Sequence, residues 1–232
     1  MSDTTKQNLT VRLTHDLGID IVRGVYPIGT GVPSEAELCT QYNVSRSCIR
    51  EAVKMLSAKG LISSRPKQGI RVLPETSWNM FDTDVLKWIL GSKPSLTLLK
   101  EFTQMRLAIE PQSAVLACLN ATDMQLQDIE KALDRMKDAE QGLDDTLQAD
   151  IAFHTSILVA SGNRFFVQLS DFISTALHVS IRYTNRIKGV SGPDVEKHSD
   201  IYNMIKSRDP EKAQKAVFKI LHEALALIES QL

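Results

Sequence analysis

Two ionisable side chains, Asp150 and His154, have the types and spacing of a metal-ligand pair. They lie four residues apart in ADIAFHTSIL, a segment expected to be helical. The carboxylate and the imidazole therefore project from one face and could share a divalent ion. The alternative is a hydrogen bond on the helix surface, which is the commoner role of such a pair. His198 and His222 lie in two later helical segments, and their spacing alone does not show whether they converge on Asp150 and His154.

A second pair, Arg46 and Arg50, has the chemistry of DNA recognition. The two arginines are also four residues apart and project together, so both could reach guanine edges or flanking phosphates. Ser45 and Ser47 lie at the amide-rich start of the same segment, where a phosphate would dock. The alternative is an ordinary basic face in contact with solvent.

The elements that would position these arginines are short helices. Apolar residues recur at helical spacing from Leu9 to Arg23 and predict a first helix. Ser34 and Glu37 have the spacing of a capping box, so a second helix is expected over about 35–42. Ser45 can cap a third helix that ends at Gly60. The result is a helix-turn-helix with Arg46 and Arg50 on its last helix.

After this helix the spacing of apolar residues no longer has the helical period. Residues 61–65 and 70–73 favour two short strands of a hairpin, and Lys67, Gln68 and Gly69 occupy its turn. The glycine allows the backbone to approach a partner closely. Three helices followed by such a hairpin form a winged helix-turn-helix, in which the third helix enters a major groove and the wing lies beside it.

The remainder of the chain predicts an all-helical domain. Residues 74–81, which begin Pro-Glu-Thr-Ser, are expected to be a linker, and 82–232 a bundle of antiparallel helices. Thr122 with Gln125, and Asp209 followed by Pro210, are strong signals for helix starts. A chain of 232 residues with 43% hydrophobic residues has room for two cores. We therefore expect a mainly α protein with domains at 1–73 and 82–232.

Composition narrows the class of protein. The net charge is −1, but residues 1–73 hold 10 basic and 6 acidic side chains, which makes the N-terminal part the candidate for contacting phosphates. The three cysteines form no CxxC pair, which is typical of reduced thiols. No apolar run is long enough to span a membrane or act as a secretory signal, so a cytoplasmic protein is expected.

The N-terminal motifs resemble a known family. VPSEAEL, YNVSRSCIREAVKMLSAKGLI and KQGIRV are similar to the winged helix of the GntR family of bacterial regulators. The resemblance implies that Arg46 and Arg50 contact an operator, assisted by Ser45, Ser47 and the wing at Lys67, Gln68 and Gly69. Ala36 stands where a fatty-acid-responsive member has an operator-contacting arginine, and the wing has one glycine where two are common.

The C-terminal part resembles the FCD domain of the FadR subfamily, a helical bundle that binds organic acids. In that family a D-x-x-x-H helix and two later histidines hold a metal, which implies Asp150, His154, His198 and His222 as ligands here. Such a set suits Zn or Ni. Open coordination positions would be available to the carboxylate or hydroxyl of an effector.

The same resemblance suggests the effector site. MRLAIEPQSAVLA matches the Arg-x-x-x-Glu start of the domain, so Arg106 is a candidate clamp for an effector carboxylate. The alternative is a structural salt bridge to Glu110. Asn163, Arg182 and Asn203 are weaker candidates for lining the pocket. The segment SWNMFDTDVLKWIL looks like sugar-acid-responsive members of the subfamily and implies an aldonate or uronate-type effector.

These features together indicate a DNA-binding transcription regulator, most simply a repressor of a sugar-acid or other organic-acid operon. A homodimer on a palindromic operator would double the contacts of a single winged helix. The first alternative is a metal-dependent sugar-acid enzyme that carries a DNA-binding module, although the chain has no GxSxG, P-loop or GxGxxG motif. The second is an architectural DNA binder with a structural metal, which would carry more positive charge.

Overall fold

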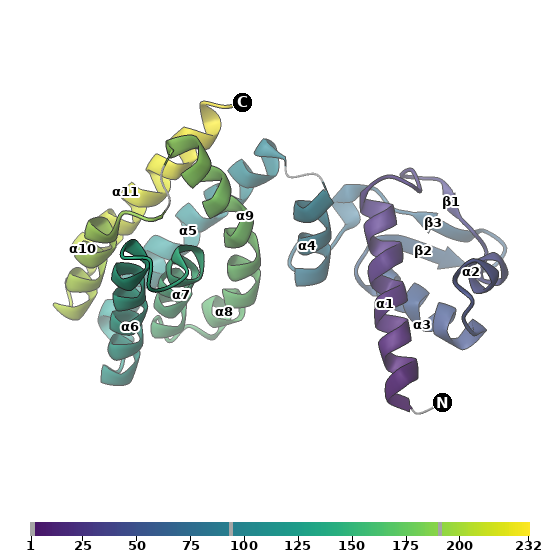
Figure 1. The fold of residues 1–232 in the computed structure, drawn as a ribbon, viewed down its shortest axis with the longest axis horizontal. Helices are drawn as coiled ribbons and strands as arrows, with labels where there is room; N and C mark the ends of the chain where they lie inside the picture. The colour runs from purple at the N-terminus through teal and green to yellow at the C-terminus, as the bar shows by residue number, and fades with distance from the viewer. Residues whose placement is uncertain (1–2, 93–94, 190–191) are drawn as a thin grey trace. The chain divides into compact units, whose positions relative to one another are not determined.

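The computed structural model describes residues 3–92, 95–189 and 192–232, with backbone only for 3–8 and 188. The chain divides into two compact units, Met1–Lys93 and Pro94–Leu232, and each is considered by itself (Figure 1). Every helix within the described residues is too short or too polar to cross a bilayer.

The N-terminal unit begins with the expected helix-turn-helix. Its helices are α1 (Asp3–Val22), α2 (Glu35–Tyr42) and α3 (Arg46–Ala58). Ser34 and Glu37 form the capping box of α2, and the Ser45 side chain accepts a hydrogen bond from the Cys48 amide at the start of α3. Between the two helices Asn43 adopts a left-handed conformation, φ 51°, which closes the turn.

A three-stranded sheet forms the wing. Strand β2 (Ile62–Arg65) pairs antiparallel with β3 (Gly69–Val72), as the hairpin pattern predicts, and Arg65 lies opposite Gly69 at the tip. A third strand, β1 (Gly31–Val32), pairs with the other edge of β3. This strand was not expected, because two residues are too few to show a period.

Two tryptophans fix the end of this unit. Trp78, after the short helix η1 (Glu75–Ser77), is buried and donates a hydrogen bond to the Leu73 carbonyl. Trp88 on α4 (Thr83–Ser92) packs over Gly18 of α1, where a Cβ would lie 2.3 Å from its ring. Its indole Nε1 donates to His15 Nδ1 at 2.8 Å. Both tryptophans belong to the hydrophobic core of the N-terminal unit.

The domain boundary therefore differs from the expected one. The segment 74–81 is largely exposed but is anchored by buried Trp78 in the core of the N-terminal unit, and α4 packs against α1 rather than within the second unit. Lys59 reinforces this packing through ion pairs to Asp82 and Asp84 at 2.8 and 2.9 Å. The two compact units meet in sequence at Lys93 and Pro94, which lie outside the described residues.

The C-terminal unit is the expected helical bundle (Figure 1). Its helices are α5 (Leu96–Asn120), α6 (Asp123–Glu140), α7 (Thr146–Ala160), α8 (Arg164–Gln168), α9 (Ser170–Lys188), α10 (Val195–Lys206) and α11 (Pro210–Glu229). Helix α11 packs along α5, α6 along α7, and α10 contacts α11, α6 and α5. One apolar core joins α5, α6, α7, α10 and α11. Thr122 and Asp209 cap α6 and α11 as predicted.

Candidate metal centre, cavity and DNA-recognition surface

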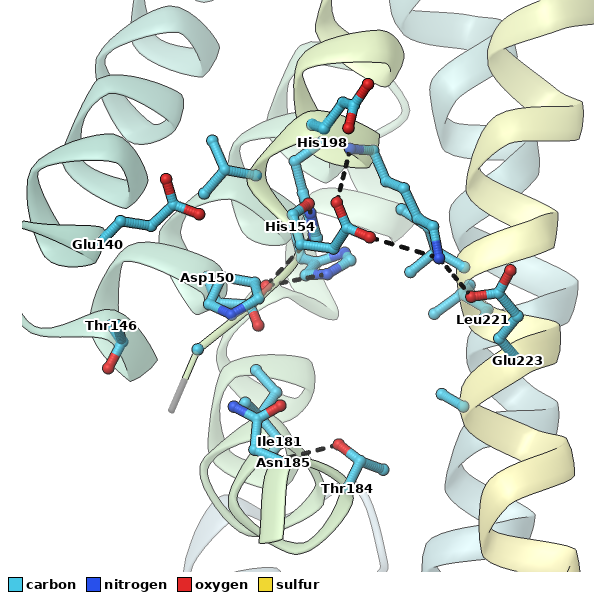
Figure 2. Close-up of a pocket in the computed structure, with 18 of the residues that line it drawn as sticks. Glu140, Thr146, Asp150, His154, Ile181, Thr184, Asn185, His198, Leu221 and Glu223 are labelled. Atoms are coloured by element: carbon cyan, nitrogen blue, oxygen red, sulfur yellow. Dashed lines mark hydrogen bonds and ion pairs between the residues drawn. The ribbon is translucent and has the colours of Figure 1, made fainter. Parts of the chain in front are cut away.

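Three of the predicted metal ligands converge. Asp150 and His154 project from the same face of α7, and His198 reaches them from α10. One potential ligand atom of each lies within 4.8 Å of the others, and all three residues are buried (Figure 2). The spacing along α7 and the packing of α10 beside it thus place one carboxylate and two imidazoles around one point.

Two polar atoms of this cluster lack hydrogen bonds, as expected for metal ligands when no ion is bound. Asp150 Oδ1 and His198 Nε2 are buried and form no hydrogen bond of good geometry among the described residues, although they lie 3.5 Å apart and His154 Nε2 lies 3.3 Å from Asp150 Oδ1. His198 Nδ1 lies 2.7 Å from the Asp194 carbonyl and, as a donor to it, leaves Nε2 with a lone pair facing the cluster. Buried polar atoms without partners are costly, and a cation bound between these three residues would satisfy them.

Glu110 of α5 orients the second imidazole. Its Oε2 lies 2.8 Å from His154 Nδ1, which directs Nε2 towards Asp150 Oδ1 at 3.3 Å. A carboxylate behind a ligating histidine is the usual way in which proteins fix the tautomer and the ring direction at a metal. The residues present therefore fit a divalent ion held by Asp150, His154 and His198.

The electrostatics of the cluster couple its charges tightly. Burial alone would lower the pKa of His154, but Glu110 and Asp150 outweigh burial and raise it to about 9. Burial would raise the pKa of Glu110, whereas Arg106 and His154 hold it at about 2. The pKa of Asp150 also lies well below its ordinary value, because His154 and His198 overcome the cost of burial. Without a metal, a protonated His154 thus bridges two carboxylates.

His222 does not join this cluster. It is exposed on α11 and stacks on the Phe218 ring, with 5.6 Å between centroids and 12° between planes. Its neighbours Ile220, Leu221 and Glu223 line the cavity beside the cluster instead. The cluster in this structure therefore holds three of the four expected ligands, and the helical rotation of α11 turns position 222 towards solvent.

The cluster opens into a cavity of about 920 Å³ within the C-terminal unit. Figure 2 shows Glu140 and Thr146 on one side of the cluster, Glu223 on the other, and Thr184 and Asn185 of α9 below it. The cavity is large enough for a small organic ligand.

Arg106 is the only one of the four predicted effector-binding residues among the described residues that line the cavity. It is buried, and its guanidinium forms two hydrogen bonds to Glu110, so the structural salt bridge is formed. Asn163 instead caps α8 by accepting from the Phe165 amide. Arg182 and Asn203 are exposed.

The residues predicted to contact DNA form an exposed surface on the N-terminal unit. Arg46 and Ser47 are exposed on the first turn of α3, next to the Ser45 cap. Arg50 is one turn later and pairs with Glu35 of α2, with 3.0 Å between Arg50 Nε and Glu35 Oε2. The buried face of α3 holds Ile49, Ala52, Val53 and Leu56, so the basic face is directed outwards.

The wing presents the other predicted residues. Lys67, Gln68 and Gly69 are exposed at the tip between β2 and β3. Lys67 and Gly69 both have positive φ values, 64° and 73°, so the turn is tight. An exposed helix with two arginines can enter a major groove of DNA, and a short wing beside it can contact the adjacent backbone.

Comparison with known proteins decides the family. Residues 9–72 match the family described as bacterial regulatory proteins, gntR family, and residues 101–223 match the FCD domain. The chain belongs to the GntR family, with an FCD domain. It is a transcription regulator, and the matched relatives are regulators rather than enzymes.

Several relatives of this GntR-family regulator are similar over most of their length. The galactonate operon transcriptional repressor of Escherichia coli K12 is 33% identical over 92% of this chain and 94% of its own. The repressor NanR of Klebsiella aerogenes is 31% identical over 91% of this chain and 82% of its own. The Glc operon transcriptional activator of E. coli K12 is 28% identical over 84% of this chain and 79% of its own.

Solved structures share the fold. Lar of Listeria monocytogenes has a TM-score of 0.61 and 17% identity, covering 95% of this chain and 96% of that one. E. coli McbR/YncC has a TM-score of 0.50 and 18% identity, with coverage of 96% and 98%. The mainly α architecture with an N-terminal winged helix is thereby confirmed.

Some functional candidates of this regulator were missed from the sequence. Thr146, Thr184, Asn185 and Glu223 line the cavity, but no motif marks them because they come from three separate helices, α7, α9 and α11. Glu110 could have been found. It follows Arg106 by four residues, and a buried carboxylate that faces both an arginine and a histidine is a common partner of a metal ligand.

Proposed function

We propose that this regulator binds operator DNA through α3 and the wing and responds to a carboxylate effector held at a metal in the FCD domain. The observation that carries the proposal is the buried cluster of Asp150, His154 and His198, with unpaired ligand atoms facing a cavity of about 920 Å³. A purely structural site would not need an adjoining cavity of this size.

The metal in this proposal is Zn or Ni. Two imidazoles and one carboxylate are borderline ligands that suit both ions. Three protein ligands leave at least one position of a tetrahedral or octahedral ion open. When bound, the ion would supply the positive charge that attracts the carboxylate of the effector.

The effector class follows from the relatives. One similar repressor is that of the galactonate operon, and galactonate is an aldonate. We therefore infer an aldonate or uronate-type sugar acid as the effector. The relatives include two repressors and one activator. Repression relieved by the effector is the form of regulation that we propose.

The DNA-binding form is proposed to be a homodimer on a palindromic operator. The exposed face of α3 offers Arg46 and Arg50, with Ser45 and Ser47 beside them, which is enough for one half-site only. Two half-sites would bring specificity into the range of known operators. The wing, with Lys67, Gln68 and Gly69, would contact the flanking backbone.

Coupling between the two activities would run along the chain through α4 and α5. Helix α4 packs on α1 of the DNA-binding unit, and α5 carries Glu110, the partner of His154. An effector changes DNA affinity only as far as it binds two conformations differently. A preference of about 3 kcal/mol would weaken operator binding at most about 150-fold.

The test combines DNA selection with effector titration. The Zn-loaded protein selects its operator from random duplexes, and fluorescence anisotropy then measures the Kd with and without galactonate, gluconate or glucuronate. We expect a palindromic operator and a large loss of affinity with one of these acids. His198→Ala should bind the operator with the affinity of the parent protein and lose the response. Unchanged operator affinity with every acid would overturn the proposal.

A further inference from the structure

The cavity next to the metal cluster is strongly acidic. Among the described residues that line it, five side chains carry carboxylates and two, besides the histidines of the cluster, carry cations. The carboxylates are Glu140, Asp150, Asp194, Glu196 and Glu223, and the cations are Arg106 and Lys197. An acidic cavity is unexpected in a domain that is proposed to bind an acid.

Neither cation is free to receive a carboxylate. Arg106 is buried against Glu110, which accepts two hydrogen bonds from its guanidinium. Lys197 Nζ lies 2.7 Å from Glu223 Oε2 and 3.4 Å from Asp194 Oδ2. An anion that enters the metal-free cavity therefore meets uncompensated negative charge, which repels it.

A divalent ion at the buried cluster would make the charge more positive only at the end of the cavity next to that cluster. Asp150 Oδ1 and His198 Nε2 are the buried atoms without a hydrogen bond there, so the ion and the effector carboxylate are confined to that end. The other walls keep their carboxylates, with Glu140 on α6 and Glu223 on α11, as Figure 2 shows. A second carboxylate or a phosphate on the same ligand would face these walls.

The same walls suit hydroxyl groups. The carboxylates of Glu140 and Glu223 can accept hydrogen bonds from hydroxyls, and the Asn185 amide can both donate and accept. Thr184 directs its own hydroxyl hydrogen to the Ser180 and Ile181 carbonyls, which leaves its oxygen as an acceptor. Acceptors therefore surround the part of the ligand that lies away from the metal.

We propose that the effector is a polyhydroxylated monocarboxylate that binds only with the metal, and that Glu140 and Glu223 exclude dicarboxylates and phosphorylated acids. This proposal rests on the proposed function and narrows it. The carboxylate lies at Asp150, His154 and His198, and the hydroxyl groups of the chain hydrogen-bond to the acidic walls.

The test is isothermal titration calorimetry of the Zn-loaded and the chelator-treated protein. The probes are galactonate, its dicarboxylate galactarate, phosphogluconate and the neutral polyol galactitol. We expect binding of galactonate to the Zn-loaded protein only, and an affinity for galactarate and phosphogluconate at least about tenfold lower. Galactitol should not bind, because it has no carboxylate for the metal.

The selective variant is Glu223→Gln, which keeps the size of the side chain and removes the nearer of the two carboxylates that pair with Lys197. We expect it to gain affinity for galactarate by about tenfold while its affinity for galactonate changes less. The matched control is Glu229→Gln on the same helix, whose partner is Lys100 and which does not line the cavity. Glu140→Gln is a second variant, on another helix, that should shift selectivity in the same direction.

The outcomes separate the two proposals. Galactarate binding as tightly as galactonate in the parent protein would overturn the inference and leave the proposed function standing. Equal binding of galactonate with and without metal would also overturn the inference. A Zn-loaded protein that binds none of the acids would refute the proposed function itself. The parent-protein comparisons stand even if a variant fails to fold.

Discussion

The arginines at the two candidate sites occupy opposite environments. Arg46 and Arg50 lie on the exposed face of α3, whereas Arg106 of α5 is only 4% exposed and is paired with buried Glu110. A guanidinium exposed to water is well solvated and remains available to a phosphate or a guanine. In the interior it needs a permanent partner. The same residue type therefore serves recognition in one unit and holds a site together in the other.

The largest effect should follow from removing Glu110. Glu110→Ala leaves the buried charges of Arg106 and His154 without their carboxylate, so we expect the free energy of unfolding to fall by about 3–5 kcal/mol. Urea unfolding followed by circular dichroism measures this loss. The control is Glu229→Ala, which breaks the surface pair with Lys100 and should cost about 0–1 kcal/mol. Equal losses would contradict the assignment of Glu110 to a buried network.

The exposed arginines should show the reverse pattern. Arg46→Ala removes a side chain with no structural partner among the described residues, so the melting temperature should not change. If the arginine reads a base, operator binding should weaken by about 1–3 kcal/mol at constant salt. Fluorescence anisotropy on the selected operator measures the effect, with Lys54→Ala on the same helix as the control. A fall in melting temperature without a change in Kd would show a structural role instead.

The buried network should also respond to pH when no metal is bound. The folded protein raises the pKa of His154 from 6.5 to about 9, so folding favours its protonated form. The resulting stabilisation is complete below pH 6.5, falls as pH rises, and is lost above about 9. Zn competes with the proton on Nε2, so its affinity should rise over the same interval.

Thermal unfolding of the chelator-treated protein between pH 6 and 10 measures the stability, and a fluorescent zinc competitor measures the affinity. His154→Gln is the comparison, because it cannot be protonated in this range and should lose the pH dependence. A zinc affinity that is constant from pH 6 to 9 would show that His154 does not bind the ion.

The two units also differ in how far their sites can be predicted from sequence. The capping residues Ser34 and Ser45 act within three residues, so α2, α3 and the exposure of Arg46 follow from local pattern. The pair Asp150 and His154 is local in the same sense. Strand β1 and the packing of Trp88 on Gly18 depend on partners about 40 to 70 residues away, and local pattern does not contain that information.

His222 shows the same limit within one helix. A helical residue is turned by about 100° from its neighbour, so a shift of one or two positions decides whether a side chain meets a cavity or solvent. Ile220 and Leu221 line the cavity, and His222 stacks on Phe218 at the surface. Family resemblance supplies a histidine near the right place, but only the packing of α11 on α5 fixes its direction.

The smallest expected effect therefore comes from His222→Ala. Its ring is exposed, so the free energy of unfolding should change by no more than about 0.5 kcal/mol. The zinc affinity should change less than about twofold, whereas His198→Ala removes a buried ligand atom and should abolish tight binding. Competition with a fluorescent chelator measures both variants side by side. A comparable loss of zinc affinity in the two would mean that α11 rotates when the ion binds, and the metal site would then hold four protein ligands.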